Sequence, residues 1–325
     1  MAYAEKDNTK FLDIANEIIS DEAKKNHTLL AKDLKKVLNN RNQNIFKTDS
    51  ISKRFKDNIP IPRDSERGFP LLEIREYHCS FNDLVLNHDV SDKLITLVDE
   101  FQYKEIFNSY GLKPKQKILF CGPPGTGKTL SAKVISSELN FPLVYIRFDS
   151  IVSSYLGETA TNLTKIFDFI EKGEWVVLFD EFDIIGKKRD DPYEHGEIKR
   201  VVNNFMQMLD NFKGLSLIIA ATNHPHLLDT AIWRRFNDIL YFDMPDYKRR
   251  HDIFDKYLKV FKRADNLDIE KFSDSTEAFS PADISQICEE ALRRIILQNK
   301  IEITNEEVNW AIEQQIKKKE IIHRN

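Results

Sequence analysis

Short, almost uninterrupted apolar runs alternate with longer stretches of helical period between residues 117 and 242. The runs are KILF (117–120), PLVYIRF (142–148), WVVLF (175–179), SLIIAA (216–221) and ILYF (239–242). Such runs are typical of strands buried on both faces, and the helical stretches between them fit crossover connections. The pattern therefore predicts an α/β fold in which helices cover both faces of a five-stranded parallel sheet.

Helical periods without strand signals occupy the two ends of the chain. Apolar residues recur every three or four positions within residues 1–45, and this period returns after Pro245. Ser280 begins one late helix as a capping serine, followed by proline and by an acid at the third position. Prolines and a glycine within residues 60–70 mark a boundary. We expect a small helical region over residues 1–65, a sheet domain over 66–245 and an all-helical domain over 246–325.

Composition is that of an ordinary globular protein. Of 325 residues, 41% are hydrophobic and 31% charged, and the net charge is −4, which gives no global signal for nucleic-acid binding. Residues 31–56 hold eight Lys or Arg against two Asp, a pattern that favours a solvated helix face over a nucleic-acid arm. We expect no signal peptide and no membrane span, since no apolar stretch approaches the required length of roughly 18 residues. Three scattered cysteines, Cys79, Cys121 and Cys288, argue against disulfides and for the cytoplasm.

A glycine-rich turn links the first predicted strand to a helix. It reads Gly122-x-x-x-x-Gly127-Lys128-Thr129. Glycines let successive backbone N–H groups turn toward phosphate oxygens, and the start of the helix adds its positive dipole end. Lys128 can reach the outer phosphates and Thr129 can bind Mg²⁺. Because a strand and a helix flank the motif as this chemistry requires, a phosphate site is favoured over an incidental turn.

Two acids, Asp180 and Glu181, end the third predicted strand in WVVLFDEFD. The carboxyl ends of parallel strands meet at one edge of a sheet, so Asp180 can reach Mg²⁺ at the glycine-rich turn. Glu181 can orient and deprotonate an attacking water. Together with the turn, these acids predict phosphate hydrolysis rather than an exposed acidic strand end.

Polar residues also follow the fourth predicted strand. Asn223 can hold the attacking water or sense the γ-phosphate, although an ordinary turn asparagine is an equal alternative. Arg234 and Arg235 in LDTAIWRRF are planar, bidentate cations that suit transition-state phosphate charge. Lys128 already serves the chain's own site, so these arginines suit a neighbour's ATP. The alternative for an arbitrary arginine pair is surface salt bridging.

GPPGTGKT, LFDEFD, AATN and LDxAxxRRF, in this order and spacing, resemble the AAA subfamily of AAA+ ATPases from about Phe81 to the C-terminus. The resemblance implies a P-loop αβα sandwich, a C-terminal all-α lid, and ring hexamers that bind ATP or ADP with Mg²⁺ at subunit interfaces. Two or three residues commonly separate the family's two arginines, whereas here they are adjacent. Which arginine reaches across to the neighbour therefore stays open.

The resemblance also assigns roles to single residues. It places the metal between Thr129 and Asp180, and it makes Glu181, Asn223, Arg234 and Arg235 catalytic. Asp83 and Val85 match the segment that reads adenine, and Tyr257 and Ala282 match the lid side of that pocket. The residues expected to hold the nucleotide are Asp83, Val85, Pro124, Gly125, Thr126, Gly127, Lys128, Thr129, Leu130, Tyr257 and Ala282.

The stretch SSYLGE places a large aromatic residue outside any apolar period. Tyr155-Leu156-Gly157 resembles the family's first pore loop. In a ring these loops converge on the axis, where an aromatic side chain can hold an extended polypeptide with little demand on its sequence. The alternative is a tyrosine that folds back onto its own subunit.

These features lead us to expect a cytoplasmic, homo-oligomeric ATP-hydrolysing motor that unfolds or remodels protein substrates, which the N-terminal helices recruit. The sequence has no HExxH motif, so degradation would need a separate protease. The layout is similar to small bacterial AAA ATPases, some of which are encoded beside a subtilisin-like serine protease. A nucleic-acid remodelling ATPase and an ATP-gated scaffold with little hydrolysis are the alternatives.

Overall fold

The computed structural model divides the chain into two compact units, Met1–Ile59 and Pro60–Asn325. The predicted N-terminal helices and Tyr155 lie outside the described residues. Among the described helices, none is both long and apolar enough to cross a membrane. The residues that the structure describes are 60–64, 68–147, 156–182 and 192–323.

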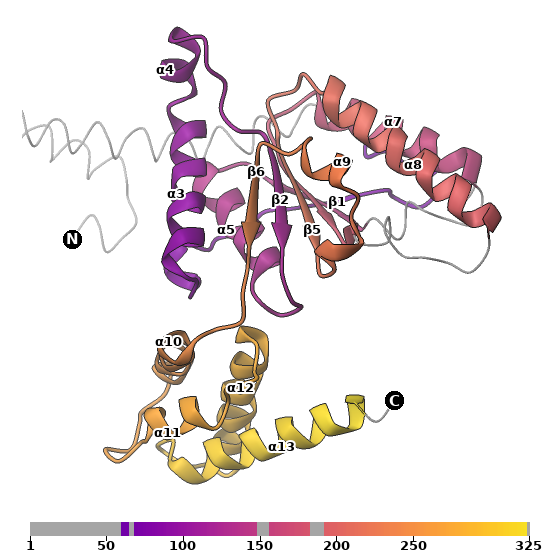
Figure 1. The fold of residues 1–325 in the computed structure, drawn as a ribbon. Helices are drawn as coiled ribbons and strands as arrows, with labels where there is room; N and C mark the ends of the chain where they lie inside the picture. The colour runs from indigo at the N-terminus through magenta and orange to yellow at the C-terminus, as the bar shows by residue number, and fades with distance from the viewer. Residues whose placement is uncertain (1–59, 65–67, 148–155, 183–191, 324–325) are drawn as a thin grey trace, which may run out of the picture. The chain divides into compact units, whose positions relative to one another are not determined.

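A mostly parallel sheet forms the centre of the second unit, with the strand order β1-β3-β4-β5-β2-β6 (Figure 1). Every pairing from β3 across to β6 is parallel, which confirms the predicted five-stranded sheet. The strands lie within one residue of the predicted apolar runs. Their bounds are Lys117–Cys121 (β2), Leu143–Arg147 (β3), Val176–Asp180 (β4), Leu217–Thr222 (β5) and Asp238–Tyr241 (β6).

A sixth strand, β1 (Glu73–Arg75), was not predicted. It pairs antiparallel with β3, with Ile74 opposite Val144. Its three residues place a single apolar side chain between two charged ones, so they carry no period that separates a strand from a turn. The strand is recognisable only through its partner, and it covers what would otherwise be an open edge of β3.

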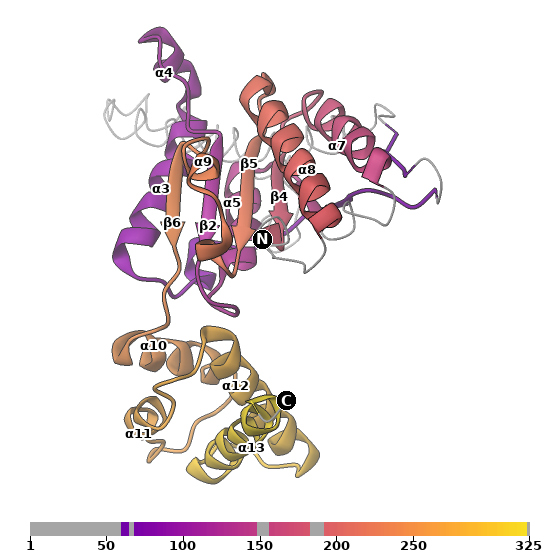
Figure 2. The same cartoon turned by 45° about the vertical axis from the view of Figure 1, so that its right-hand side comes forward.

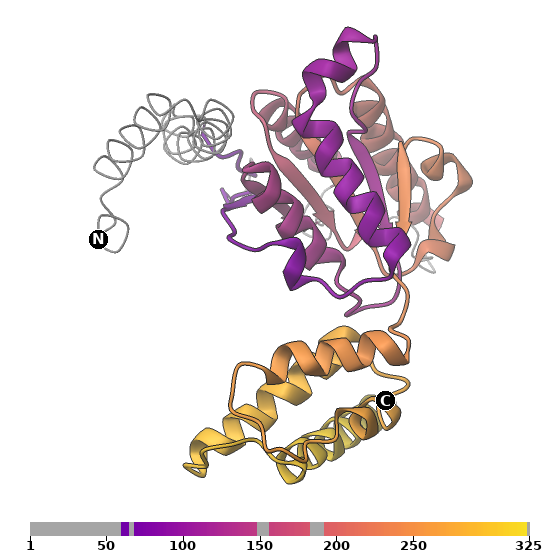
Figure 3. The same ribbon diagram turned by 90° about the vertical axis from the view of Figure 1, so that its left-hand side faces the viewer.

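Helices cover both faces of the sheet (Figures 1 and 3). On one face lie α3 (His88–Gln102), which continues into the short α4 (Lys104–Ser109), and α5 (Lys128–Leu139). On the other lie α7 (Leu156–Ile170) and α8 (Pro192–Asn211). The stripe of α3 that packs into the core keeps the helical period. It consists of Val90, Leu94, Leu97, Val98 and Phe101.

Phenylalanines fill the face beneath α7 and α8. The ring of Phe205 on α8 lies 5.1 Å from that of Phe179 on β4 and 5.6 Å from that of Phe167 on α7, measured between centroids. Phe182, two residues beyond β4, also lies 5.1 Å from Phe205. Aromatic edge contacts stabilise beyond the burial of their area. They fix the chain on both sides of the acids at positions 180 and 181.

The region after β6 is all-helical, as predicted (Figure 2). It has its own apolar core, which includes Phe254, Phe272 and Ile287. Ser280 caps α12 as expected: its Oγ accepts the Asp283 N–H at 3.2 Å, and the Asp283 carboxylate accepts the Ser280 N–H at 2.9 Å. The helices are α10 (Tyr247–Leu258), α11 (Ile269–Asp274), α12 (Pro281–Leu297) and α13 (Asn305–His323).

The order of the strands places the polar strand ends together. The chain leaves β2 through α5 and returns as β3 on the far side of β4 and β5. In such open parallel sheets, ligands bind beyond the carboxyl ends of the strands where the winding direction reverses. The ends of β2, β4 and β5 meet at this point.

Candidate functional site

The glycine-rich turn joins β2 to α5. Three of its glycines have positive φ angles, 142° at Gly122, 75° at Gly125 and 99° at Gly127, which residues with a side chain rarely adopt. A Cβ at Gly122 would lie 2.1 Å from the carbonyl oxygen of Phe242. The chain can therefore turn this tightly only with glycine, and the loop runs directly into the N-terminus of α5, where anions bind favourably.

Lys128 is buried within this loop. Its Nζ donates hydrogen bonds of 2.7 Å to the carbonyl oxygens of Gly122 and Pro123, and the residue is 6% exposed. A buried ammonium group needs such acceptors, because burial without them is costly. Phosphate oxygens would offer stronger, charge-assisted hydrogen bonds to the same group. The loop thus keeps a cation where a phosphate can reach it.

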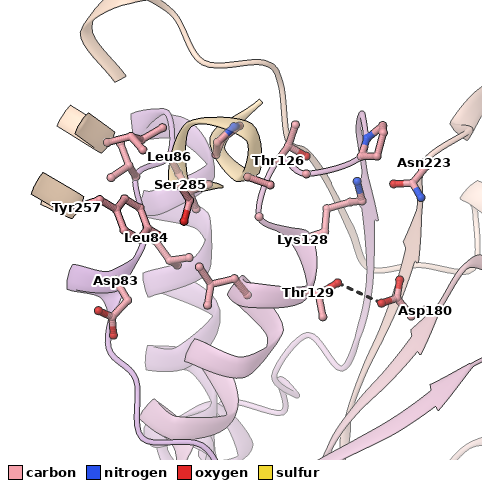
Figure 4. A pocket seen from close by; sticks show the side chains of 18 of the residues that line it. Asp83, Leu84, Leu86, Thr126, Lys128, Thr129, Asp180, Asn223, Tyr257 and Ser285 are labelled. Atoms are coloured by element: carbon pink, nitrogen blue, oxygen red, sulfur yellow. Dashed lines mark hydrogen bonds between the residues drawn. The ribbon is translucent and has the colours of Figure 1, made fainter. Parts of the chain in front are cut away.

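Asp180, the last residue of β4, is held at both carboxylate oxygens. Oδ2 accepts the hydroxyl of Thr129 at 3.1 Å, shown as a dashed line in Figure 4, and that of Tyr145 at 3.3 Å. Oδ1 accepts the backbone N–H of Glu181 at 3.0 Å. A hydroxyl and a carboxylate oxygen therefore meet at the start of α5, and such hard oxygen ligands are those that Mg²⁺ prefers.

Glu181 follows in a left-handed backbone conformation, with a φ of 56°. Residues other than glycine rarely adopt this conformation, and when they do they often lie at functional sites. The Glu181 side chain is 47% exposed, and its Oε2 lies 3.8 Å from a guanidinium nitrogen of Arg147. The turn thus separates the two neighbouring acids, with Asp180 fixed and Glu181 open to solvent.

Tyr145 is a contact of this site that the sequence did not reveal. Burial, together with the negative charge and hydrogen bond of Asp180, raises the pKa of Tyr145 to about 12. The hydroxyl therefore stays protonated and donates at neutral pH. In the sequence Tyr145 is one residue of the apolar run PLVYIRF. Its hydroxyl, a polar group within that run, was the only sign of a contact with the site.

A cavity of about 450 Å³ lies over these residues (Figure 4), within the usual size range of small-molecule sites. It brings together every residue that was expected to hold nucleotide or metal, and Glu181 and Asn223 as well. The predicted residues that line it are Asp83, Val85, Pro124, Gly125, Thr126, Gly127, Lys128, Thr129, Leu130, Asp180, Glu181, Asn223, Tyr257 and Ala282.

The end of the cavity away from Asp180 presents the apolar side chains of Leu84, Leu86 and Tyr257, with Asp83 and Ser285 beside them (Figure 4). Its walls come from the segment after the short helix η1 (Phe81–Asp83) and from α10. Ile253 and Tyr257 of α10 lie four residues apart and share one face of the helix. Because Tyr257 was predicted to line the cavity, this spacing could have indicated that Ile253 lines it too. The lining residues that the sequence missed are Leu84, Leu86, Ile253, Pro281 and Ser285.

Two hydrogen bonds connect the helical domain to the sheet domain beside the cavity. The N–H of Ala282 donates to the carbonyl oxygen of Gly125 at 3.1 Å, and Nζ of Lys256 donates to that of Asn82 at 2.9 Å. A Cβ on Gly125 would lie 2.7 Å from Oγ of Ser280. The start of α12 therefore lies directly against the glycine-rich turn, and glycine permits the approach.

The two arginines follow the four-residue helix α9 (Thr230–Trp233) and do not line the cavity. Arg235 is tied to its own chain: Nε lies 3.2 Å from the Asp210 carboxylate, and a terminal nitrogen donates to the carbonyl oxygen of Ala231 at 2.8 Å. Arg234 is exposed, and its side chain makes no hydrogen bond or ion pair with the described part of the chain. The structure thus brings Asn223 to the cavity but not the arginines.

The expected pore loop lies at the edge of what the structure describes. Leu156 and Gly157 begin the backbone of α7. Tyr155 and the side chains of Leu156 and Glu158 lie outside the described residues. The position of this loop therefore stays a prediction.

Comparison with known proteins adds independent findings. A profile of the family described as ATPase family associated with various cellular activities (AAA) matches residues 118–244. The uncharacterized AAA family ATPase y4kL of Sinorhizobium fredii is 38% identical over 311 residues, which cover 95% of this chain and 91% of that protein. A proteasome-activating nucleotidase of Saccharolobus solfataricus is 37% identical over 215 residues, 64% of this chain and 55% of that protein. A putative cell division cycle ATPase of Plasmodium falciparum is 32% identical over 223 residues, 67% of this chain and 18% of that protein.

These similarities agree with the geometry of the site. The profile match begins within β2 and ends after β6, so it includes the glycine-rich turn, both acids and Asn223. The similarity to y4kL extends along nearly the whole length of both proteins. The protein binds nucleotide and hydrolyses ATP, and the chain belongs to the AAA family of ATPases.

Proposed function

We propose that the protein is a ring-forming motor that uses ATP to unfold or remodel protein substrates. The observation that carries this proposal is the division of the charged and polar residues expected to act on phosphate. Lys128, Asp180, Glu181 and Asn223 line one cavity, whereas Arg234 is exposed outside it. Among the described residues no arginine lines this cavity, and an exposed arginine elsewhere on the chain fits completion of the site by a second copy.

The cavity suits ATP because its two ends differ. We place the triphosphate along Gly122–Thr129 and the adenine between Leu84, Leu86 and Tyr257. Thr129 and Asp180 would hold Mg²⁺, which when bound neutralises charge on the phosphates. Glu181 takes a proton from the attacking water, and Asn223 orients that water.

Arg234 is the proposed residue that acts across the subunit interface. A guanidinium group suits this role because it is always charged and can hold two phosphate oxygens at once. Arg235 has contacts within its own chain through Asp210 and Ala231, so we propose that it positions the turn. A closed ring of such contacts, which we expect to be a hexamer, gives every subunit one complete site.

The substrate is proposed to be protein. The name of one relative, proteasome-activating nucleotidase, describes a protein that acts on a protease complex, which supports this choice. Tyr155-Leu156-Gly157 would contact the polypeptide in the pore through apolar and stacking interactions. A separate serine protease is the proposed partner for degradation, and co-purification of the two proteins in the presence of ATP tests that partnership.

The variant Tyr155→Ala tests the proposed motor. We expect it to retain ATP hydrolysis within about twofold, because no cavity-lining residue changes, and to lose unfolding of a tagged fluorescent substrate. Tyr110→Ala removes another tyrosine, 80% exposed and distant in sequence, and should keep both activities. Full substrate processing by the Tyr155→Ala protein would contradict the pore-loop assignment.

A further inference from the structure

Tyr145 lies behind the cavity rather than in its wall. It is the middle residue of β3, opposite Leu178 of β4, and Arg147 is opposite Asp180. Residues paired across neighbouring strands share a face, and side chains two apart on a strand do so as well. Tyr145 and Asp180 therefore project from the same face of the sheet, and Tyr145 is not among the residues that line the cavity.

The contacts of the Asp180 carboxylate leave it little freedom to rotate. Oδ2 accepts from Tyr145 at 3.3 Å and from Thr129 at 3.1 Å, while Oδ1 accepts the N–H of Glu181 at 3.0 Å. Thr129 is one of the two side chains proposed to bind the metal ion, through a lone pair of the same oxygen that donates its hydrogen to Asp180. Of the two side chains that hold Oδ2, Tyr145 alone has no other proposed task.

Packing by itself does not require the hydroxyl. The Tyr145 ring is half-buried against the apolar cluster beneath α3 and α5, a place that phenylalanine would fill equally well. A tyrosine hydroxyl brought into such surroundings needs a hydrogen-bond partner, and the carboxylate that it meets is Asp180. The residue type is therefore explained by this contact and not by the core.

We propose that Tyr145 is a positioning residue, whose hydroxyl orients the Asp180 carboxylate for binding of the metal–nucleotide complex. Outer hydrogen bonds of this kind orient metal-binding side chains, and their loss typically weakens metal affinity by about 10-fold to 100-fold. The inference rests on the metal site proposed above, and it is independent of rings and of protein substrates.

The test compares Tyr145→Phe with the parent, using Mn²⁺ as the probe. Binding of Mn²⁺ in the presence of ADP is measured by electron paramagnetic resonance, and binding of ADP without metal is measured by calorimetry. We expect Mn²⁺ affinity to fall about 10-fold and metal-free ADP affinity to stay within about twofold. Tyr241→Phe, on β6 at the opposite edge of the same sheet and 55% exposed, should match the parent in both measurements.

A second comparison separates positioning from a general loss of structure. In an Asp180→Asn background, Tyr145→Phe should produce no further loss of Mn²⁺ affinity, because both changes break the same contact. Equal Mn²⁺ affinity in parent and Tyr145→Phe would overturn the proposal, and so would failure of the variant to fold, since the hydroxyl would then serve the fold. A parent that binds no Mn²⁺ with ADP would remove the metal site itself.

Discussion

The acidic end of β4 and the arginine turn after α9 are both charged, and both are expected to act on the phosphates of ATP, the acids in their own subunit and the arginine in a neighbour's site. They differ in how the chain holds them. Asp180 accepts hydrogen bonds from the hydroxyls of Thr129 and Tyr145 and from the N–H of Glu181. The side chain of Arg234, in contrast, is exposed and has no hydrogen bond or ion pair with the described residues.

The difference shows which catalytic groups a single chain can hold in place before the subunits assemble. Groups that bind phosphate and metal in the ground state are pre-organised, because a misplaced charge in a half-buried site is costly. For an arginine that acts in another subunit, hydrogen bonds within its own chain are a disadvantage, because these bonds would have to break when the subunits assemble. A residue's lack of partners is therefore as informative as a dense set of contacts.

Lys128→Ala should have the largest effect on ATP binding, because it removes the buried cation of the glycine-rich turn. Each charge-assisted hydrogen bond contributes about 1.5–3 kcal/mol, so the loss of two should weaken ATP binding by more than about 100-fold. Lys133→Ala is the control: Lys133 lies on the same helix α5 and does not line the cavity. Fluorescent-nucleotide titration measures both, and retained binding by Lys128→Ala would contradict the assignment of the loop.

The predictable part of the site is the part that short motifs encode. Gly122–Thr129 form one continuous segment, and an apolar run followed directly by Asp180 and Glu181 identifies a strand end. Both follow from local rules of strand, turn and helix. The five parallel strands were predictable for the same reason.

The missed parts depend on contacts between distant segments. Tyr145 and Asp180 are 35 residues apart and meet because β3 and β4 pair in one register. Similarly, Ser285 reaches the cavity because α12 starts against Gly125, and β1 exists only as a partner of β3. No local pattern carries such information. The adjacency of Arg234 and Arg235 likewise left their roles open until their different contacts were visible.

Mixing two impaired variants tests whether an acid of one subunit and an arginine of its neighbour act in the same site. Arg234→Ala and Glu181→Gln should each lower ATP hydrolysis by at least about 10-fold, because each site then lacks a group that acts in the transition state. Mixed assemblies contain some interfaces that combine an intact Glu181 with an intact Arg234 from the neighbour. We therefore expect hydrolysis to rise above that of either variant alone.

Arg235→Ala is the matched control for that experiment. It removes a bond to Asp210 at the surface, and exposed ion pairs contribute only about 0–1 kcal/mol, so hydrolysis should fall by less than about fivefold. A mixture of Arg234→Ala and Glu181→Gln that stays inactive, although both proteins assemble, would show that the two residues do not meet across an interface.

Among substitutions of residues that line the cavity, Tyr257→Ala should have the smallest effect, because binding at the base end is spread over several side chains. An aromatic contact with a flat base contributes about 0.5–1.5 kcal/mol beyond burial, so ATP affinity should fall by about 3-fold to 10-fold. Hydrolysis at saturating ATP should change little, since Tyr257 is on the lid helix α10 and lies away from Asp180 (Figure 4). Tyr247→Ala removes a tyrosine from the same helix that does not line the cavity, and its KM should match that of the parent. A fall in kcat at unchanged KM for Tyr257→Ala would mean that the lid helix takes part in the chemistry, and the division between a binding end and a reacting end of this cavity would have to be abandoned.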